Sequence, residues 1–174
     1  MDSFVETYRR PPSALAFMAR AFLPSPGLPP GGSLPRIVQR WPSLRIDPAH
    51  LDAFRQAIGW TGRPEVPVLY PHVLGFRLMM ATLTHRAFPL PIFNGLQVRN
   101  RLVRHGAIDV GGTYDFEVRT GAHRALQKGI EVDLLGAMTQ GSRRVFDSTV
   151  TFFFRARAAA TAGTAQALAS PGLE

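Results

Sequence analysis

The most apolar segment of the chain is residues 69–83, LYPHVLGFRLMMATL. When this segment is wound into a helix, apolar side chains occupy nearly every face, and Arg77 is its only charged residue. Pro71 suits the first turn, where a missing N–H removes no helical hydrogen bond. A helix that is apolar on all sides must be enclosed by other elements, and this one is too short to span a bilayer. We therefore expect a central, enclosed helix at about residues 71–84.

Segments with the period-two pattern of β-strands follow this helix. Apolar and polar residues alternate at 113–119 and 130–134 and in part at 96–104, and residues 145–154 are rich in β-branched and aromatic side chains. The breaks between them contain glycines, Gly121 among them, and leave no room for crossover helices, so neighbouring strands should be antiparallel. The pattern predicts an α+β fold in which four antiparallel strands wrap around the central helix.

Weaker signals precede the central helix. Residues 36–46 carry a weak strand pattern, and Asp47, which precedes a proline, is the predicted N-cap of a helix at 48–58. A short helix is predicted at 13–23, and the proline- and glycine-rich residues 24–35 should form a loop. The predicted organisation is an N-terminal arm with its linker, one folded domain and a flexible tail, at residues 1–35, 36–157 and 158–174.

The composition of the chain limits the kinds of partner and of site that we expect. The formal net charge is +8, and Lys128 is the only lysine among the 20 basic residues. These arginines are spread along the chain without the clustering or aromatic interleaving typical of nucleic-acid binding, so no nucleic-acid partner is expected. A basic surface also suits anionic small partners, such as coenzyme A phosphates or an acidic carrier protein. The absence of cysteine excludes disulfides, zinc–thiolate sites and a thiol nucleophile.

No targeting segment is expected at the N-terminus. Arg9 and Arg10 precede the apolar run at 13–23, but this run is short and Arg20 interrupts it. No membrane span is predicted either, and a cytoplasmic location is expected.

Three segments carry a resemblance to a known family. Residues 93–118, FNGLQVRNRLVRHGAIDVGGTYDFEV, resemble the MaoC-like dehydratase superfamily, in which a second strand leads through a basic turn into a third. Residues 67–101 look more like the N-terminal, catalytically degenerate hotdog of two-domain acyl dehydratases, and TVTFFFRAR at 149–157 resembles its closing strand. The resemblance covers about residues 35–157. It implies a single hotdog fold, an antiparallel sheet wrapped around one helix.

The resemblance also implies a reaction. Members of this superfamily hydrate enoyl thioesters, or dehydrate (R)-3-hydroxyacyl thioesters, of coenzyme A or carrier protein, and no cofactor is implied. Their active half carries Asp-x-Asn-Pro-x-His, whose carboxylate and imidazole must face one thioester. The corresponding residues here, 59–66, read GWTGRPEV and retain only Pro64, while Glu65 offers a carboxylate at a different position. The chain thus resembles a hotdog that lacks its own Asp/His pair.

Candidate site residues follow from this comparison, each with a structural alternative. His72 and Glu65 are the catalytic candidates, although His72 is as readily a half-buried histidine at a helix start. Tyr70 and Pro71 mark the start of the central helix, whose N–H groups could bind the thioester carbonyl. Candidate substrate contacts lie in the following strand, where a turn and a solvated strand face are the alternatives: Asn94, Gly95, Arg99, Arg101 and Arg104.

The other histidines and one aromatic cluster carry weaker signals. His105 follows a basic turn and could contact a carrier phosphate, or be simply exposed. The others show no pairing in sequence and no i, i+4 spacing, so no metal site is expected. Residues 152–154, Phe-Phe-Phe, put aromatics on both faces of the last strand, which we interpret as an edge strand covered by the N-terminal arm or by another subunit.

Three hypotheses result. In the first, the chain is a substrate-tunnel or partner subunit of an acyl-thioester dehydratase or hydratase, a hydro-lyase, and forms a homodimer or a heterodimer with a catalytic hotdog. In the second, it is an active thioesterase or dehydratase that uses His72 and Glu65, since one fold hosts several activities. In the third, it is a non-enzymatic binding or assembly module.

Overall fold

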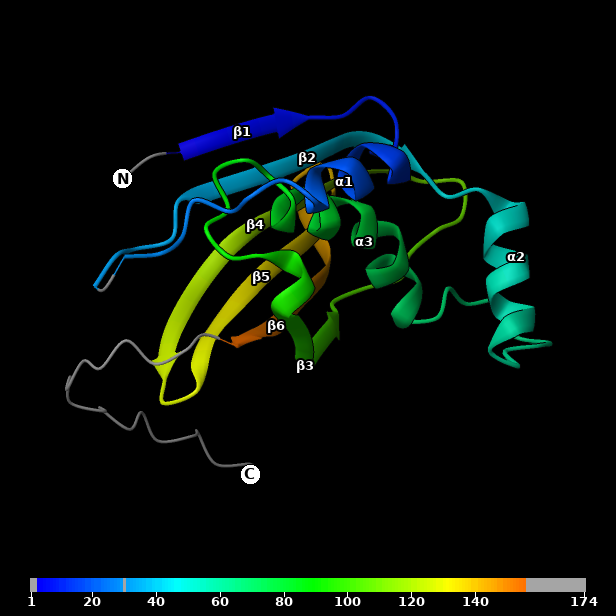
Figure 1. Ribbon diagram of the computed structural model, residues 1–174. Helices are drawn as coiled ribbons and strands as arrows, with labels where there is room; N and C mark the ends of the chain where they lie inside the picture. Colours follow the sequence, from blue (N-terminus) through cyan, green and yellow to red (C-terminus); the bar gives the residue numbers. More distant parts are fainter. Residues whose placement is uncertain (1–2, 30, 156–174) are drawn as a thin grey trace.

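A curved sheet wrapped around one helix dominates the structure (Figure 1), a computed structural model that describes residues 3–29 and 31–155. The predicted tail at 158–174 lies outside the described residues. In chain order the elements are β1 (Ser3–Thr7), α1 (Ala14–Ala21), β2 (Arg36–Arg45), α2 (Pro48–Ala57), α3 (Leu69–Leu83), η1 (Ile92–Asn94), β3 (Gly95–Arg104), β4 (Thr113–Leu126), β5 (Gly129–Gln140) and β6 (Arg143–Arg155).

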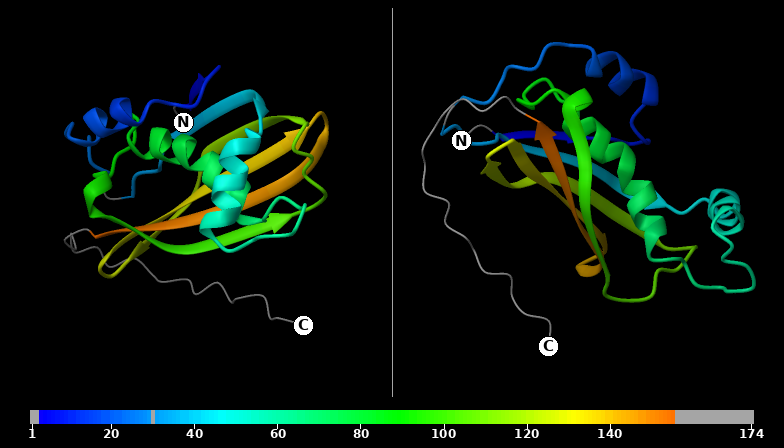
Figure 2. Two further views of the ribbon diagram at one scale, coloured as in Figure 1. Left: turned by 90° about the vertical axis from the view of Figure 1, so that its right-hand side faces the viewer. Right: turned by 60° about the horizontal axis from the view of Figure 1, so that its bottom comes forward.

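The central helix is confirmed as α3, which lies in the concave side of the sheet (Figure 2). Glycine lets it approach closely, because a Cβ on Gly75 would lie 2.6 Å from the Phe116 ring. The enclosure, however, is incomplete. One stripe, spaced i, i+4, i+7 and i+11, remains partly or fully exposed: Leu69, Val73, Phe76 and Met80.

The sheet order is β1-β2-β4-β5-β6-β3, and every pairing is antiparallel except that of β1 with β2. The sequence did not predict β1, which pairs in parallel from Ser3 opposite Arg36 to Thr7 opposite Arg40. Part of the segment expected to be an arm therefore belongs to the sheet.

Three further expectations about the strands were wrong. β3 and β4 are consecutive in sequence but not neighbours, because the loop at 105–112 carries the chain from β3, at one edge, across to β4, beside β2. Gly121 is not a break, since β4 continues through it and shifts register between Thr120 and His123. β6 is an interior strand between β5 and β3, so the phenylalanines at 152–154 do not lie on an edge. Phe152 and Phe154 belong to the core instead.

A bulge in β3 also changes the predicted faces. The register shifts between Gln97, opposite Phe152, and Arg99, opposite Thr151. Since an extra residue turns the following side chains to the other face, Leu96 shares the outer face with Arg99 rather than the inner face with Leu102. Arg104 lies opposite the core residue Phe146 and so belongs to the inner face, apart from Arg99 and Arg101.

The helix preceding α3 begins as the sequence predicts. Asp47 is the N-cap of α2, and its carboxylate accepts a hydrogen bond of 2.9 Å from the Ala49 N–H. Gly59 follows the helix with a φ of 68°, a value that favours glycine. Among the described residues, no helix has both the length and the hydrophobicity needed to cross a membrane.

Candidate functional site

Two adjoining hollows lie between the segment before α3 and the start of the β3–β4 loop. Pro64, Glu65 and Arg104 line both of them. The larger part of the loop, including His105 and Asp109, lines one hollow of about 560 Å³, and Trp60 and Arg63 line the other. The structure thus brings two of the predicted site residues, Glu65 and Arg104, to one place.

Two arginines fix the segment that carries Glu65. Arg55 of α2 donates from Nη2 to the carbonyls of Pro64 (2.5 Å) and Glu65 (3.1 Å). Arg104 donates from Nη1 to the carbonyl of Val66 at 3.3 Å. The backbone is therefore held between α2 and β3, while the Glu65 side chain is exposed to the hollow. The Arg104 guanidinium thus binds the backbone of this segment, and it forms no ion pair with a carboxylate among the described residues.

A carboxylate–imidazole pair that sequence analysis missed lies beside the same hollow. His105 Nε2 is 2.8 Å from Asp147 Oδ2, and Arg144 Nη1 is 3.2 Å from the other oxygen of that carboxylate. The pairing of β3 with β6 creates this contact, because Val103 lies opposite Asp147. Its two members are 42 residues apart in sequence, so only a correct prediction of that pairing could have found it.

His72 lies apart from Glu65. It is 8% exposed in the first turn of α3, lines neither hollow, and its buried Nδ1 has no hydrogen-bond partner among the described residues. Burial lowers the pKa of His72 below its usual range, which favours the neutral imidazole. The structure therefore does not place His72 with Glu65 in either of these two hollows.

The start of α3 is packed rather than open. Tyr70 is fully buried, its hydroxyl is 2.8 Å from His50 Nδ1, and its ring packs on Phe54 of α2 at 5.3 Å between centroids. Burial, reinforced by the charge of Asp47, raises the pKa of Tyr70 to about 12. Pro71 is buried beside it. These two side chains support the helix start, and any contact with a thioester there would come from backbone groups.

The other predicted substrate contacts lie along the β3 edge. Asn94 ends η1, and Gly95 begins β3 at a point where a Cβ would lie 2.7 Å from the Phe154 ring. Arg99 and Arg101 point from the outer face, where Arg99 Nη2 is 2.6 Å from Glu131 Oε2. The structure therefore separates these residues from the hollow that holds Glu65 and Arg104.

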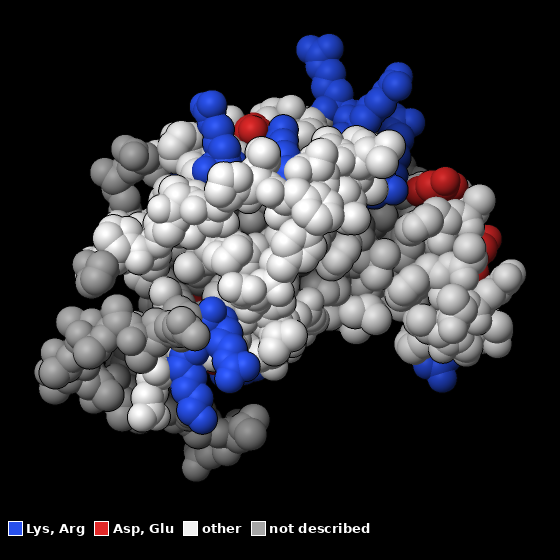
Figure 3. Space-filling view, in the orientation of Figure 1, with Lys and Arg blue, Asp and Glu red and all other residues white. Residues whose placement is uncertain are grey.

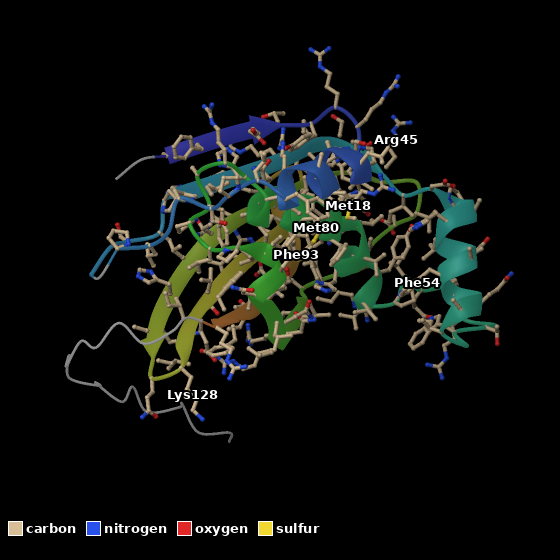
Figure 4. The ribbon with its side chains drawn as sticks, in the orientation of Figure 1. Met18, Arg45, Phe54, Met80, Phe93 and Lys128 are labelled. Carbon is tan, nitrogen blue, oxygen red and sulfur yellow. The ribbon has the colours of Figure 1, made fainter. Side chains whose placement is uncertain are left out.

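Next to this edge, the helix side of the molecule is apolar. The middle of the face in Figure 3 is largely free of charged side chains. Figure 4 shows Met18 of α1, Met80 of α3 and Phe93 of η1 along the same side of the molecule. Phe22, which ends α1, packs on Phe93 at 5.2 Å between ring centroids. Four apolar residues of α1, its C-cap and η1 are more than half exposed: Leu15 (82%), Phe22 (73%), Phe93 (65%) and Met18 (55%).

No protein-family model matches the chain. A curated relative, 3-hydroxyacyl-thioester dehydratase X of Mycobacterium tuberculosis, is 27% identical over 147 residues. This match covers 84% of the present chain and 52% of the relative. The crystal structure of that protein superimposes with a TM-score of 0.62 at 25% identity, over 68% of this chain and 51% of the other. The chain thus spans about half the length of the relative it matches.

Two other solved structures share the fold. A chain of the HadBC complex, a (3R)-hydroxyacyl-ACP dehydratase of M. tuberculosis, matches with a TM-score of 0.57 at 13% identity, over 70% of this chain and 97% of its own. The (R)-hydratase of A. caviae, which is involved in PHA biosynthesis, matches with a TM-score of 0.52 at 18% identity, over 66% of this chain and 92% of its own. At these identities the likeness shows the fold, one sheet wrapped around one helix.

Proposed function

We propose that this chain, a MaoC-like hotdog protein, is a cytoplasmic partner subunit of an acyl-thioester dehydratase or hydratase rather than a complete enzyme. The observation that carries the proposal is that residues 59–66, which line both hollows before α3, contain neither the aspartate nor the histidine of the family's Asp-x-Asn-Pro-x-His segment. Glu65 is the only carboxylate in that segment, and His72 is buried elsewhere. Acid–base work on a thioester needs both groups within hydrogen-bond reach of one substrate.

The surface of the chain supports a partner. A helix that is apolar on all sides is stable when it is covered, yet α3 leaves a stripe partly open. The relative named above is about twice as long as the matched region, which leaves room for a second domain. We infer that the counterpart of that second domain is a catalytic hotdog that pairs with this one. In that assembly the present chain would shape the acyl channel with the stripe on α3.

The test is hydration of crotonyl-CoA and of longer enoyl-CoAs by the purified chain, followed by loss of the enoyl thioester absorbance. We expect no turnover above background from the chain alone. Turnover should appear when it is mixed with the product of an adjacent gene that encodes Asp-x-Asn-Pro-x-His. Robust hydration by the chain alone would reject the proposal.

One observation favours the second hypothesis, an active enzyme with other residues. Glu65 and His105 line one hollow, and Asp147 orients the imidazole of His105. In this case, during hydration, Glu65 would accept a proton from the attacking water and His105 would donate a proton to the substrate Cα. Substituting Glu65→Ala and His105→Ala should then abolish any hydration by the chain alone, while His123→Ala should leave it unchanged. Equal rates in all three variants would remove both roles.

A further inference from the structure

The β3 edge is the longer of the two open edges of the sheet. β3 has ten residues, and no strand pairs with its outer side within residues 3–29 and 31–155. The opposite edge is β1, with five residues. Short edge strands resist pairing, whereas a long one presents a row of free N–H and C=O groups to another strand. Leu96 and Val98 on β3 are 67% and 45% exposed. An added strand would therefore pair with β3.

The outer face of this edge is basic. Its side chains after the bulge are Arg99, Arg101 and Val103. Arg99 is neutralised by Glu131, while Arg101 is exposed and has no ion pair among the described residues. A strand added here therefore meets at least one unpaired guanidinium.

A second copy of the chain fits this edge poorly. In an antiparallel pair, residues that lie directly opposite share a face. When two β3 strands pair about Asn100, Arg99 of each copy lies opposite Arg101 of the other; when they pair about Arg101, the two copies of Arg101 meet. Like charges directly opposite each other are destabilising, and the net charge of +8 on each copy adds repulsion.

We propose that the β3 edge selects a different chain, whose edge strand carries Asp or Glu opposite Arg101 and Arg99, and disfavours a second copy of this chain. The proposal rests on the proposed function, in which the partner is another hotdog, and it adds the chemistry of that partner's edge. Main-chain hydrogen bonds supply affinity in such strand addition, and the side-chain charges supply the choice of partner.

The test needs the purified chain and three variants, two of which have equal net charge. Arg101→Glu places a carboxylate opposite Arg99 of a second copy in the register about Asn100. A one-to-one mixture of Arg101→Glu with the natural chain places it opposite Arg101 in the other register. Lys128→Glu, at the far β4–β5 turn, makes the same change in net charge away from the edge (Figure 4). Sedimentation equilibrium at about 0.05 M and about 0.5 M salt measures self-association with and without screening.

We expect the dimer dissociation constant of Arg101→Glu alone to be about tenfold lower than that of the natural chain at low salt, from two cross-strand charge pairs per dimer. The mixture, with one such pair per dimer, should show a smaller decrease. High salt should weaken this dimer. The natural chain and Lys128→Glu should associate weakly, and salt should not weaken them. Arg101→Gln, which only removes the repulsion, should lie between.

Two results would overturn the proposal. One is a natural chain that dimerises as tightly as Arg101→Glu with no dependence on salt. The other is an Arg101→Glu variant that associates no better than Lys128→Glu in either sample. Neither result involves turnover, so the hydration assay judges the proposed function separately. Thermal unfolding of each variant confirms that the exposed substitutions leave the fold intact.

Discussion

The outer face of the sheet and the helix side of the molecule differ in how many of their side chains find a partner within the chain. On the outer face of β4, β5 and β6, a network of charged and polar groups is paired within the chain. Arg124 donates two hydrogen bonds of 3.0 Å to Asp133, whose Oδ1 also accepts one of 2.6 Å from Thr151, and Glu131 lies between Arg99 and Arg124. On the helix side, α1 has no buried residue and α3 leaves its stripe partly open. The network on the outer face is therefore satisfied within this chain, whereas the helix side leaves apolar side chains uncovered.

The pKa values agree with a self-contained outer face. Hydrogen bonds from Arg124 and Thr151 outweigh the opposing effect of burial and hold the pKa of Asp133 below its usual range. The guanidinium of Arg99, followed by that of Arg124, lowers the pKa of Glu131 against the same opposing effect. Both carboxylates therefore stay charged in the folded chain at neutral pH, and the network persists there.

The largest expected effect is at the contact that holds α3 against the sheet. Gly75→Ala should lower the free energy of unfolding by about 1–3 kcal/mol, because the new methyl group would overlap the Phe116 ring. In an exposed helix the same substitution would be stabilising by up to about 1 kcal/mol. Urea unfolding measures the difference. Gly111→Ala, where nothing lies within 4 Å, is the control and should change stability by less than about 0.5 kcal/mol. A stabilised Gly75→Ala variant would contradict this seating of the helix.

A smaller loss is expected from the outer face. Asp133→Asn keeps the size of the side chain but removes the charge that Arg124 and Thr151 share. The expected cost is about 1–2 kcal/mol, reduced from the value for a fully buried pair because the Arg124 side chain is 43% exposed. Urea unfolding is again the measurement. Asp52→Asn breaks an exposed pair with Arg55 and should cost less than about 0.5 kcal/mol. Equal losses in the two variants would show that the Asp133 network is no more structured than a surface pair.

Sequence patterns predicted the parts of the fold that depend on local order. The apolar residues of α3 and the cap at Asp47 are contiguous signals, and the elements formed within a few residues of the prediction. β1 escaped because Ser3–Thr7 is a very short strand whose partner lies more than thirty residues away. The bulge at Gln97–Arg99 also escaped, since alternation alone does not reveal an extra residue.

The candidate site was less predictable than the fold. Glu65 and Arg104 were named from the sequence for different reasons, and only folding placed them at one hollow. The contact between His105 and Asp147 depends on the pairing of β3 with β6. The short breaks between strands had predicted that β3 would pair with β4, the next strand in the sequence. A site whose residues lie far apart in sequence depends on which strands pair with each other. A single sequence specifies that pairing only weakly.

A pH-dependent effect should come from His72, one of two buried histidines, with His85, whose pKa burial lowers. The pKa of His72 is lowered by burial, so below its usual pKa the unfolded chain binds a proton that the folded chain does not. Stability should therefore fall as the pH drops through about 6.5 and below. Urea unfolding at about pH 5.5 and about pH 7.5 should show a smaller pH dependence in His72→Gln than in the natural chain. His123→Gln serves as the control, and a pH dependence unchanged in His72→Gln would show that His72 is protonated in the folded chain.

The smallest effect on stability is expected from two exposed apolar residues of α1, on the helix side of the molecule. Leu15 and Met18 are mostly exposed on α1, so replacing both with serine should change the free energy of unfolding by less than about 0.5 kcal/mol. Binding of a hydrophobic dye should nevertheless fall, because these side chains contribute to the open apolar face. Leu126→Ser removes a comparably exposed residue from the β4–β5 hairpin and should leave dye binding nearly unchanged. A loss of 2 kcal/mol or more on the double substitution would mean that α1 already packs against its own chain, and the helix side would then be as complete as the outer face.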